Sequence, residues 1–286
     1  MTFTVHYLTV NNINSNQKTV LVTGASSGLG ALTAQLLAER GYRVAGAARR
    51  SHLVAELPGV LPVQLDLSDE SSIDAAVSAV EAELGPVEVL INNAGYGEFG
   101  SVEETPLDRA RRQFDVNVFG LAALTRRVIG PMRDAGRGRI VNVSSLAGEF
   151  SSPLGGWYHA SKFALEALSD SMRAELRPFG IDVAVVQPGP VRTAWHGEAM
   201  RSLEASSGGG PYADMAAAVA GYHRASADAP ITSDAGTVAR VIARAATEDR
   251  PRTRYRVGRG SSTAVALSRL PDRMFDAMTR RQFGIP

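Results

Sequence analysis

The chain has 286 residues, of which 30 are Lys or Arg and 29 are Asp or Glu, which gives a net charge of +1. This length suits one α/β domain with a sizeable core, and the dispersed, balanced charge argues against nucleic acid or an anionic membrane surface as a partner. The lack of cysteine excludes disulfides and thiolate metal sites, and the five histidines show no metal-ligand spacing, so we expect no metal.

The start of the chain, MTFTVHYLTV, has neither the basic segment nor the apolar segment of a secretory signal. No apolar run approaches the ~18 residues that a membrane span needs, so we expect a cytoplasmic protein with no membrane partner. Residues 1–17 end in the polar run NNINSNQ, and we interpret them as a flexible leader.

Strand-like and helix-like segments alternate along the rest of the chain. Val, Ile and Leu runs predict strands at 19–24, 42–48, 60–66, 87–93, 138–145, 181–189 and 253–258. Helical periodicity predicts helices at 28–41, 69–85, 106–135, 157–179 and 234–247. The strands are continuous apolar runs, as in strands buried on both faces. The chain therefore predicts an α/β fold: a Rossmann-type doubly wound parallel sheet of about seven strands with helices on both faces.

Three further predictions concern organisation. The long helix at 106–135 should present Phe114, Phe119, Leu121 and Leu124 on its apolar side. Within a single catalytic domain over 18–260, the glycine run and alanine-rich pieces at 193–232 suit a mobile substrate lid. Residues 261–286 form an amphipathic helical tail that we expect to pack on the same domain.

The segment TGASSGLG, residues 23–30, follows the first strand and opens the first helix, where a diphosphate can bind at the helix N-terminus. Gly24 permits the tight turn, Gly28 allows backbone to approach the phosphates, and Gly30 allows close packing of helix and sheet. An NTPase phosphate loop is excluded because Ala31 follows Gly30. The run GASSG also fits the nucleophile elbow of hydrolases, but it follows the first strand with little chain before it.

The second strand runs into Ala47, Ala48, Arg49 and Arg50, with no acid to bind the adenosine ribose of NAD. Two guanidinium groups suit a 2′-phosphate, so we expect NADP(H) rather than NAD(H). The alternative is that both arginines are solvated charges at a strand end.

The segment YHASK holds Tyr158 and Lys162, which lie one helical turn apart on the same face. Lysine occurs only at positions 18 and 162, in a chain that otherwise uses arginine. An ammonium close to a phenol should lower the phenol pKa from ~10 and make Tyr158 a usable general acid or base. The pair predicts acid–base chemistry.

Taken together, these motifs make the chain resemble a classical short-chain dehydrogenase/reductase. The resemblance covers about residues 18–260 and rests on TGASSGLG (23–30), NNAG (92–95), DVNVFG (115–120), IVNVSS (140–145), YHASK (158–162) and PGPVRT (188–193). The tail also resembles those of members related to 17β-hydroxysteroid and retinol dehydrogenases.

The resemblance implies roles for individual residues. Tyr158 is the acid/base, Lys162 lowers its pKa, Ser145 orients the substrate oxygen, and Asn117 bends the long helix and anchors a proton-relaying water. The implied cofactor-binding residues are Gly24, Ser26, Ser27, Gly28, Leu29, Gly30, Arg49, Arg50, Asp66, Leu67, Asn92, Ala94, Gly95, Tyr158, Lys162, Pro188, Gly189, Val191 and Thr193.

We therefore expect an NADP(H)-dependent oxidoreductase that acts on the carbonyl or secondary alcohol of an apolar, medium-sized molecule. Two alternatives stay open: a non-catalytic NADP(H)-binding or sensor protein on the same fold, and an epimerase or dehydratase relative. The resemblance also implies a homodimer or homotetramer.

Overall fold

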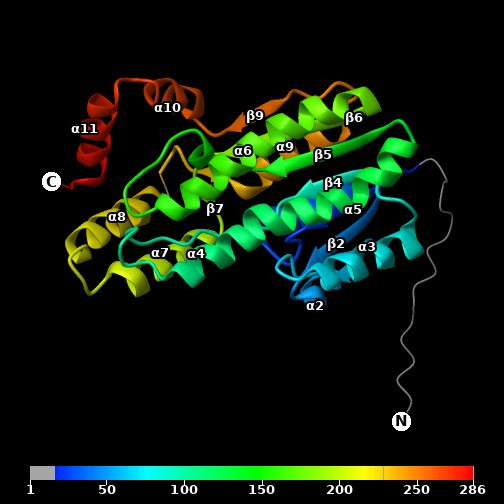
Figure 1. Cartoon of the computed structure of the whole chain (residues 1–286), viewed down its shortest axis with the longest axis horizontal. Coiled ribbons are helices and arrows are strands. Elements are labelled where there is room, and N and C mark those ends of the chain that lie inside the picture. Colours follow the sequence, from blue (N-terminus) through cyan, green and yellow to red (C-terminus); the bar gives the residue numbers. More distant parts are fainter. Residues whose placement is uncertain (1–16, 228, 286) are drawn as a thin grey trace, which may run out of the picture.

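The computed structural model describes residues 17–227 and 229–285 (Figure 1). The predicted leader over 1–17 lies outside the described residues except for Gln17. Within the described ranges, no helix combines the length and apolarity that crossing a bilayer would need.

The centre of the fold is a parallel seven-stranded sheet in the order β3-β2-β1-β4-β5-β6-β9. Its strands are β1 (Thr19–Thr23), β2 (Arg43–Ala48), β3 (Val60–Gln64), β4 (Val89–Asn92), β5 (Gly138–Val143), β6 (Ile181–Pro188) and β9 (Arg254–Val257). The predicted doubly wound parallel sheet is thus confirmed. The strand order reverses between β1 and β4, and open sheets of this type bind ligands outside the strand ends at that reversal.

Helices cover both faces of the sheet, as continuous apolar strands require. One face packs against α1 (Gly28–Glu39) and α9 (Ala235–Thr247). The other packs against α3 (Glu70–Leu84), α5 (Leu121–Asp134) and α6 (Gly156–Leu176), which lie in front of the sheet in Figure 1. A short helix that the periodicity did not predict, α2 (Ser51–Val54), follows β2.

The predicted long helix at 106–135 is divided into three parts. The segment α4 (Leu107–Phe114) leads into a π-helical turn, η1 (Asp115–Gly120), and then into α5. The wider π turn shifts the helical register, so residues before and after it do not share one face. The prediction that Phe119 lies on the apolar side is therefore wrong: Phe119 is 64% exposed, while Leu121 and Leu124 are buried.

The segment predicted as a lid contains two helices, α7 (Trp195–Ser207) and α8 (Ala213–Ser226). It is bracketed by a small unpredicted sheet of β7 (Val191–Arg192) and β8 (Ser233–Asp234). The tail forms α10 (Ser261–Leu267) and α11 (Asp272–Phe283), and α11 lies beside α8 (Figure 1). Single 3-10 turns, η2 (Leu146–Gly148) and η3 (Arg177–Phe179), complete the elements.

Candidate active site

Two loops meet where the strand order reverses, one after β1 and one after β4. The Thr23 hydroxyl accepts hydrogen bonds from the backbone nitrogens of Asn93 and Ala94, each at 3.0 Å. The Asn93 amide donates back to the Thr23 carbonyl at 2.9 Å. These three bonds fix the glycine-rich loop against the NNAG loop. The predicted site residues do not include Thr23 and Asn93, although both lie inside the motifs TGASSGLG and NNAG.

The glycine-rich loop has the shape that a dinucleotide diphosphate needs. Gly24 has φ +69°, and a Cβ there would lie 2.9 Å from Ala94 Cα, so only glycine fits. Ser27 precedes α1 without capping it, so no side-chain cap satisfies the backbone N–H groups of the first turn. At the exposed Gly28, the only atom near a built Cβ is Thr193 Cγ2, at 3.9 Å. Free donors beside open space fit a phosphate group.

Other residues of this loop have different surroundings. Gly30 is packed against Gly24, whose carbonyl oxygen would lie 2.3 Å from a Cβ, as expected for a glycine that allows close packing. Leu29 packs against the core, while Ser26 is half-buried. Gly95 is exposed, and a Cβ there would lie 3.0 Å from Asn117 Oδ1 and 3.8 Å from Lys162 Nζ. Gly95 therefore lies beside two of the predicted catalytic residues.

Tyr158 and Lys162 lie on the buried face of α6. Tyr158 is 8% exposed and Lys162 is 6% exposed. Lys162 Nζ donates to the Val143 carbonyl at 3.0 Å and lies 6.0 Å from the centroid of the Tyr158 ring. Ser145, in the turn after β5, hydrogen-bonds to Tyr158. The structure thus brings together Ser145, Tyr158 and Lys162 as the sequence predicts.

The expected effect of Lys162 on Tyr158 is wrong for this arrangement. Burial raises the pKa of Tyr158 to about 12, and the hydrogen bond from Ser145 opposes this only in part. The Lys162 ammonium contributes little because it is directed at the Val143 carbonyl. Burial also lowers the pKa of Lys162 itself to about 8, against the opposing charge of Glu166. Desolvation of the Tyr158 phenol therefore determines the direction of its pKa, rather than the lysine one helical turn away.

Asn117 occupies the π turn and connects three segments. Its Nδ2 donates to the Tyr96 carbonyl at 2.9 Å and to Ser161 Oγ at 3.1 Å, and its Oδ1 accepts from the Tyr96 nitrogen at 3.1 Å. The prediction that Asn117 marks a break in the long helix is confirmed. Its observed partners hold the loop after Gly95 against α6, beside Lys162.

The predicted adenosine-binding residues lie at the ends of β2 and β3. Arg49 and Arg50 are exposed at the end of β2. Asp66 Oδ1 accepts from the backbone and hydroxyl of Ser68 at 3.0 and 2.7 Å, and these bonds, with a smaller effect of Arg49, hold the pKa of Asp66 below its usual value. Leu67 is buried beside them.

The Asn92 side chain bonds to neighbouring elements, and its cofactor-binding role stays a prediction. It is 2% exposed, and its Nδ2 donates to Thr125 Oγ1 and Asn142 Oδ1 at 3.0 and 2.9 Å. It therefore ties β4 to β5 and α5 beneath the site. A polar residue at a strand end can point either way, and the motif alone does not decide which.

The segment after β6 lies on the same side of the crevice as the glycine-rich loop. Pro188 ends β6, and the Gly189 nitrogen donates to the Val257 carbonyl at 2.8 Å. Val191 is buried in β7, and Thr193 lies opposite Gly28. Thr193 thus lies beside the glycine-rich loop, and the cofactor-binding roles of Pro188, Gly189 and Val191 stay predictions.

An aromatic cover lies over Tyr158. The ring centroids of Phe99 and Trp195 are 5.6 and 5.1 Å from that of Tyr158. His223 of α8 lies 6.1 Å from Phe99 and the same distance from Phe283 of α11. Nothing in the local sequence marks Phe99 as a site residue, because it comes from a loop with no periodicity.

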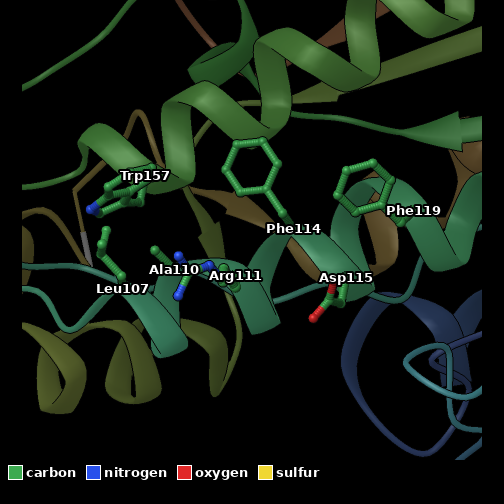
Figure 2. A pocket seen from close by; sticks show the side chains of 7 residues that line it. All are labelled: Leu107, Ala110, Arg111, Phe114, Asp115, Phe119 and Trp157. Carbon is green, nitrogen blue, oxygen red and sulfur yellow. The ribbon is translucent and has the colours of Figure 1, made fainter.

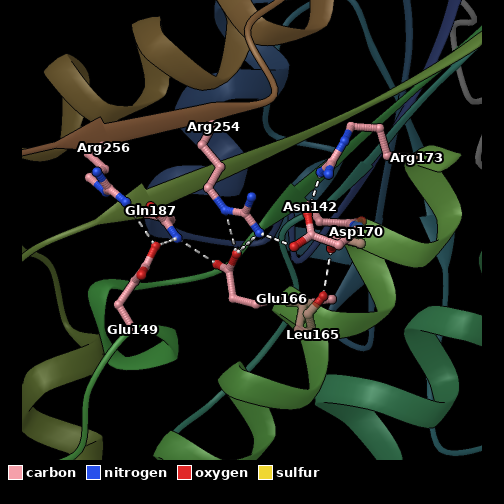
Figure 3. Close-up of polar contacts among 10 residues, drawn as sticks. Asn142, Glu149, Leu165, Glu166, Asp170, Arg173, Gln187, Arg254 and Arg256 are labelled. Atoms are coloured by element: carbon pink, nitrogen blue, oxygen red, sulfur yellow. Dashed lines mark hydrogen bonds and ion pairs between the residues drawn. The ribbon is translucent and has the colours of Figure 1, made fainter. Parts of the chain in front are cut away.

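Behind the site, a polar network links α6 to β6 and to the edge strand β9 (Figure 3). The buried Glu166 carboxylate accepts from Gln187 Nε2 and from Arg254 Nε, each at 3.0 Å. Gln187 Nε2 also donates to Glu149 Oε1 at 2.7 Å, and Arg254 donates to Asp170 Oδ2 at 2.8 Å. This network places a carboxylate one helical turn from Lys162. The described residues hold no group of three or more His, Cys, Asp or Glu side chains placed to bind a metal ion.

Comparison with known proteins agrees with this geometry. The model of the short chain dehydrogenase family matches residues 18–203. The chain is 39% identical over 176 residues to a 3-ketodihydrosphingosine reductase of Bacteroides thetaiotaomicron, with 62% of this chain and 65% of the relative covered. It is 33% identical over 205 residues to an NADPH-dependent 3-dehydrocapnine reductase of Ornithobacterium rhinotracheale, with 68% and 70% covered.

A solved structure extends the similarity to most of the chain. A short-chain dehydrogenase from Streptomyces avermitilis matches with a TM-score of 0.75 at 32% identity. The match covers 89% of this chain and 92% of that one. The similarity therefore includes the sheet and most of the helices around it.

Proposed function

This chain belongs to the short-chain dehydrogenase family, and we propose that it is an NADP(H)-dependent oxidoreductase acting on a carbonyl or secondary alcohol. The observation that carries the proposal is the convergence of Ser145, Tyr158 and Lys162 beside the glycine-rich crevice. A bound nicotinamide supplies or accepts the hydride, and the protein supplies orientation and a proton.

In the reductive direction, Tyr158 donates its phenolic proton to the carbonyl oxygen. A pKa of about 12 keeps the phenol protonated at neutral pH, which is the form that an acid needs. Ser145, which hydrogen-bonds to Tyr158, holds the substrate oxygen beside that phenol. Lys162, held on the same buried face by its bond to the Val143 carbonyl, would bind the nicotinamide ribose hydroxyls, as the family resemblance implies.

The preference for NADP(H) is supported by the end of β2. Arg49 and Arg50 stand there exposed, where an NAD site has an acid. A relative that is 33% identical is named as NADPH-dependent. The glycine-rich loop and the first turn of α1 would hold the diphosphate, and Asp66 and Leu67 would contact the adenine.

The substrate is an apolar ketone. Tyr158 belongs to a hydrophobic cluster with Phe99, Leu203, Val219 and Phe283, formed by the predicted lid and the tail. A polar substrate would bury its hydroxyl groups here without partners. A relative that is 39% identical is named a 3-ketodihydrosphingosine reductase.

A second copy of the chain is the partner proposed for the outer face of α4, η1 and α6. A groove of about 330 Å³ lies there, lined by Leu107, Ala110, Arg111, Phe114, Asp115, Phe119 and Trp157 (Figure 2). Leu107, Phe119 and Phe163 are large apolar side chains that remain exposed. Covering them would bury apolar surface from both copies.

The proposal is tested by following the hydride itself. NADPH deuterated at C4 on either face is incubated with the chain and a panel of apolar ketones, and the alcohols are analysed by mass spectrometry. We expect deuterium on the carbinol carbon with one of the two labelled cofactors. Binding of NADPH without deuterium transfer to any ketone would favour the non-catalytic alternative.

A further inference from the structure

A second cavity of about 330 Å³ opens between the end of β3 and α4. It is lined by Arg49, Ser68, Tyr96, Glu98, Arg109, Arg112 and Val116. The residues of the catalytic set and its aromatic cover do not line this cavity. It is therefore a separate space on the adenosine side of the crevice.

The charge of the lining is positive. Three guanidinium groups face one carboxylate, that of Glu98. Arg109 neutralises this carboxylate at 2.6 Å, and both side chains are largely buried. Arg49 and Arg112 remain, and both partly oppose the burial and the Glu98 charge that raise the pKa of the Tyr96 phenol. The cavity is thus lined by one cation from the end of β2 and one from α4.

Within the described part of the chain, neither Arg49 nor Arg112 forms an ion pair with a buried carboxylate. Arg49 is exposed and makes no hydrogen bond or ion pair with another described residue. Arg112 pairs with Asp108 one helical turn away at 2.9 Å, and both side chains of this pair are mostly exposed. An exposed pair of this kind contributes little and leaves the guanidinium able to bind a stronger acceptor.

We infer that Arg112 completes the binding site for the 2′-phosphate of NADP(H) by closing on it from α4, opposite Arg49. This rests on the proposed function. Arg49 and Ser68 follow β2 and β3, whose carboxyl ends hold the adenosine half of a dinucleotide in such sheets. A phosphate offers three acceptor oxygens, and two planar guanidinium groups can bind it from two sides. The sequence motif after β2 predicts Arg49 but says nothing of a residue 63 positions later, so α4 supplies a determinant that only the fold brings near.

The test uses the full chain and two soluble probes, 2′,5′-ADP and 5′-ADP, which differ only in the 2′-phosphate. Their affinities are measured by calorimetry for the wild type, Arg112→Gln, Arg112→Lys and a matched control, Arg111→Gln. Arg111 is the neighbouring residue of α4 and lines the other groove. We expect Arg112→Gln to weaken the binding of 2′,5′-ADP about tenfold and to leave the affinity for 5′-ADP unchanged. Arg112→Lys should lie between, and Arg111→Gln should match the wild type.

The outcomes separate this inference from the proposed function. If the wild type and Arg112→Gln prefer 2′,5′-ADP to the same extent, Arg112 does not bind the 2′-phosphate. The NADP(H) proposal would then remain intact. An equal loss for both nucleotides would also overturn this role of Arg112, because Arg112 would then shape the adenosine cleft. If the wild type binds 2′,5′-ADP and 5′-ADP equally well, both the NADP(H) proposal and this inference are wrong.

Discussion

The protonation of Lys162 depends on two opposing effects, its burial and the charge of a neighbouring carboxylate. Burial lowers its pKa to about 8, and the nearby Glu166 carboxylate raises it. Glu166 is itself held by Gln187 and Arg254 (Figure 3). The charge of Lys162 therefore depends on a residue outside the predicted catalytic set.

Replacement of Glu166 by Gln should move the alkaline limit of ketone reduction to lower pH. Lys162 is charged below its pKa, so loss of the carboxylate lowers that pKa and the charge disappears earlier as the pH rises. The measurement is kcat/KM with NADPH between pH 6 and 10. Glu149→Gln is the control, since Glu149 also accepts from Gln187 but does not act on Lys162. Identical profiles for Glu166→Gln and the wild type would refute this role.

At the scale of single residues, spacing predicts proximity better than it predicts electrostatics. Tyr158 and Lys162 share a helical face because helices repeat every 3.6 residues. The direction of the Tyr158 pKa depends instead on Phe99 and Trp195, which cover it from distant segments. Asn92 likewise turns to Thr125 and Asn142, partners that only the assembled sheet provides.

The helices over the active site have a pH-sensitive contact at His223. Burial lowers the pKa of His223 from 6.5 to about 4, and the charges of His196 and His159 add to this effect. The unfolded chain therefore binds a proton near pH 6.5 that the folded chain binds only near pH 4. Stability from this residue is complete above pH 6.5 and is lost as the pH falls toward 4.

His223→Phe should consequently reduce the acid sensitivity of the fold. At pH 5 the wild type loses roughly 2 kcal/mol of unfolding free energy through His223 relative to pH 7. Urea unfolding at the two pH values should show a smaller difference in the variant by about this amount. His52→Phe, on the exposed face of α2, serves as the control. An unchanged difference in His223→Phe would mean that His223 is not buried in its neutral form.

Elements with regular periodicity were predictable, whereas irregular ones were not. The strands and most helices were located to within a few residues because their apolar patterns repeat. The motif around Asn117 predicted a bend in the long helix, but the apolar periodicity did not signal a π turn, and this turn exposes Phe119. The two-residue strands β7 and β8 are too short to carry any periodicity, and they form because the predicted lid returns beside its own start.

For the whole molecule, the apolar groove of Figure 2 predicts self-association. Phe119→Asp places a charge at its exposed ring, so the charge would be buried without a partner in an assembly. Sedimentation should show a dimer or tetramer for the wild type and a shift of at least ~10-fold in dissociation constant for the variant.

The matched control is Met274→Asp. Met274 is also an exposed apolar side chain, but it belongs to α11, away from the groove. If both variants weaken the assembly, or if neither does, this face is not the interface.

The number of strands and their parallel direction could be predicted from the alternation of strand-like and helix-like segments. The face left for a partner could not, because exposure depends on the final packing.

The central claim is that Tyr158 is the acid that protonates the carbonyl. Its most direct test compares NADPH oxidation by the wild type, Tyr158→Phe and Tyr212→Phe with one reactive ketone. Tyr212 is a phenol of the predicted lid that bonds to Glu103. We predict a loss of at least ~100-fold for Tyr158→Phe, with NADPH affinity retained and Tyr212→Phe unchanged. A rate for Tyr158→Phe equal to that of the wild type would contradict the account.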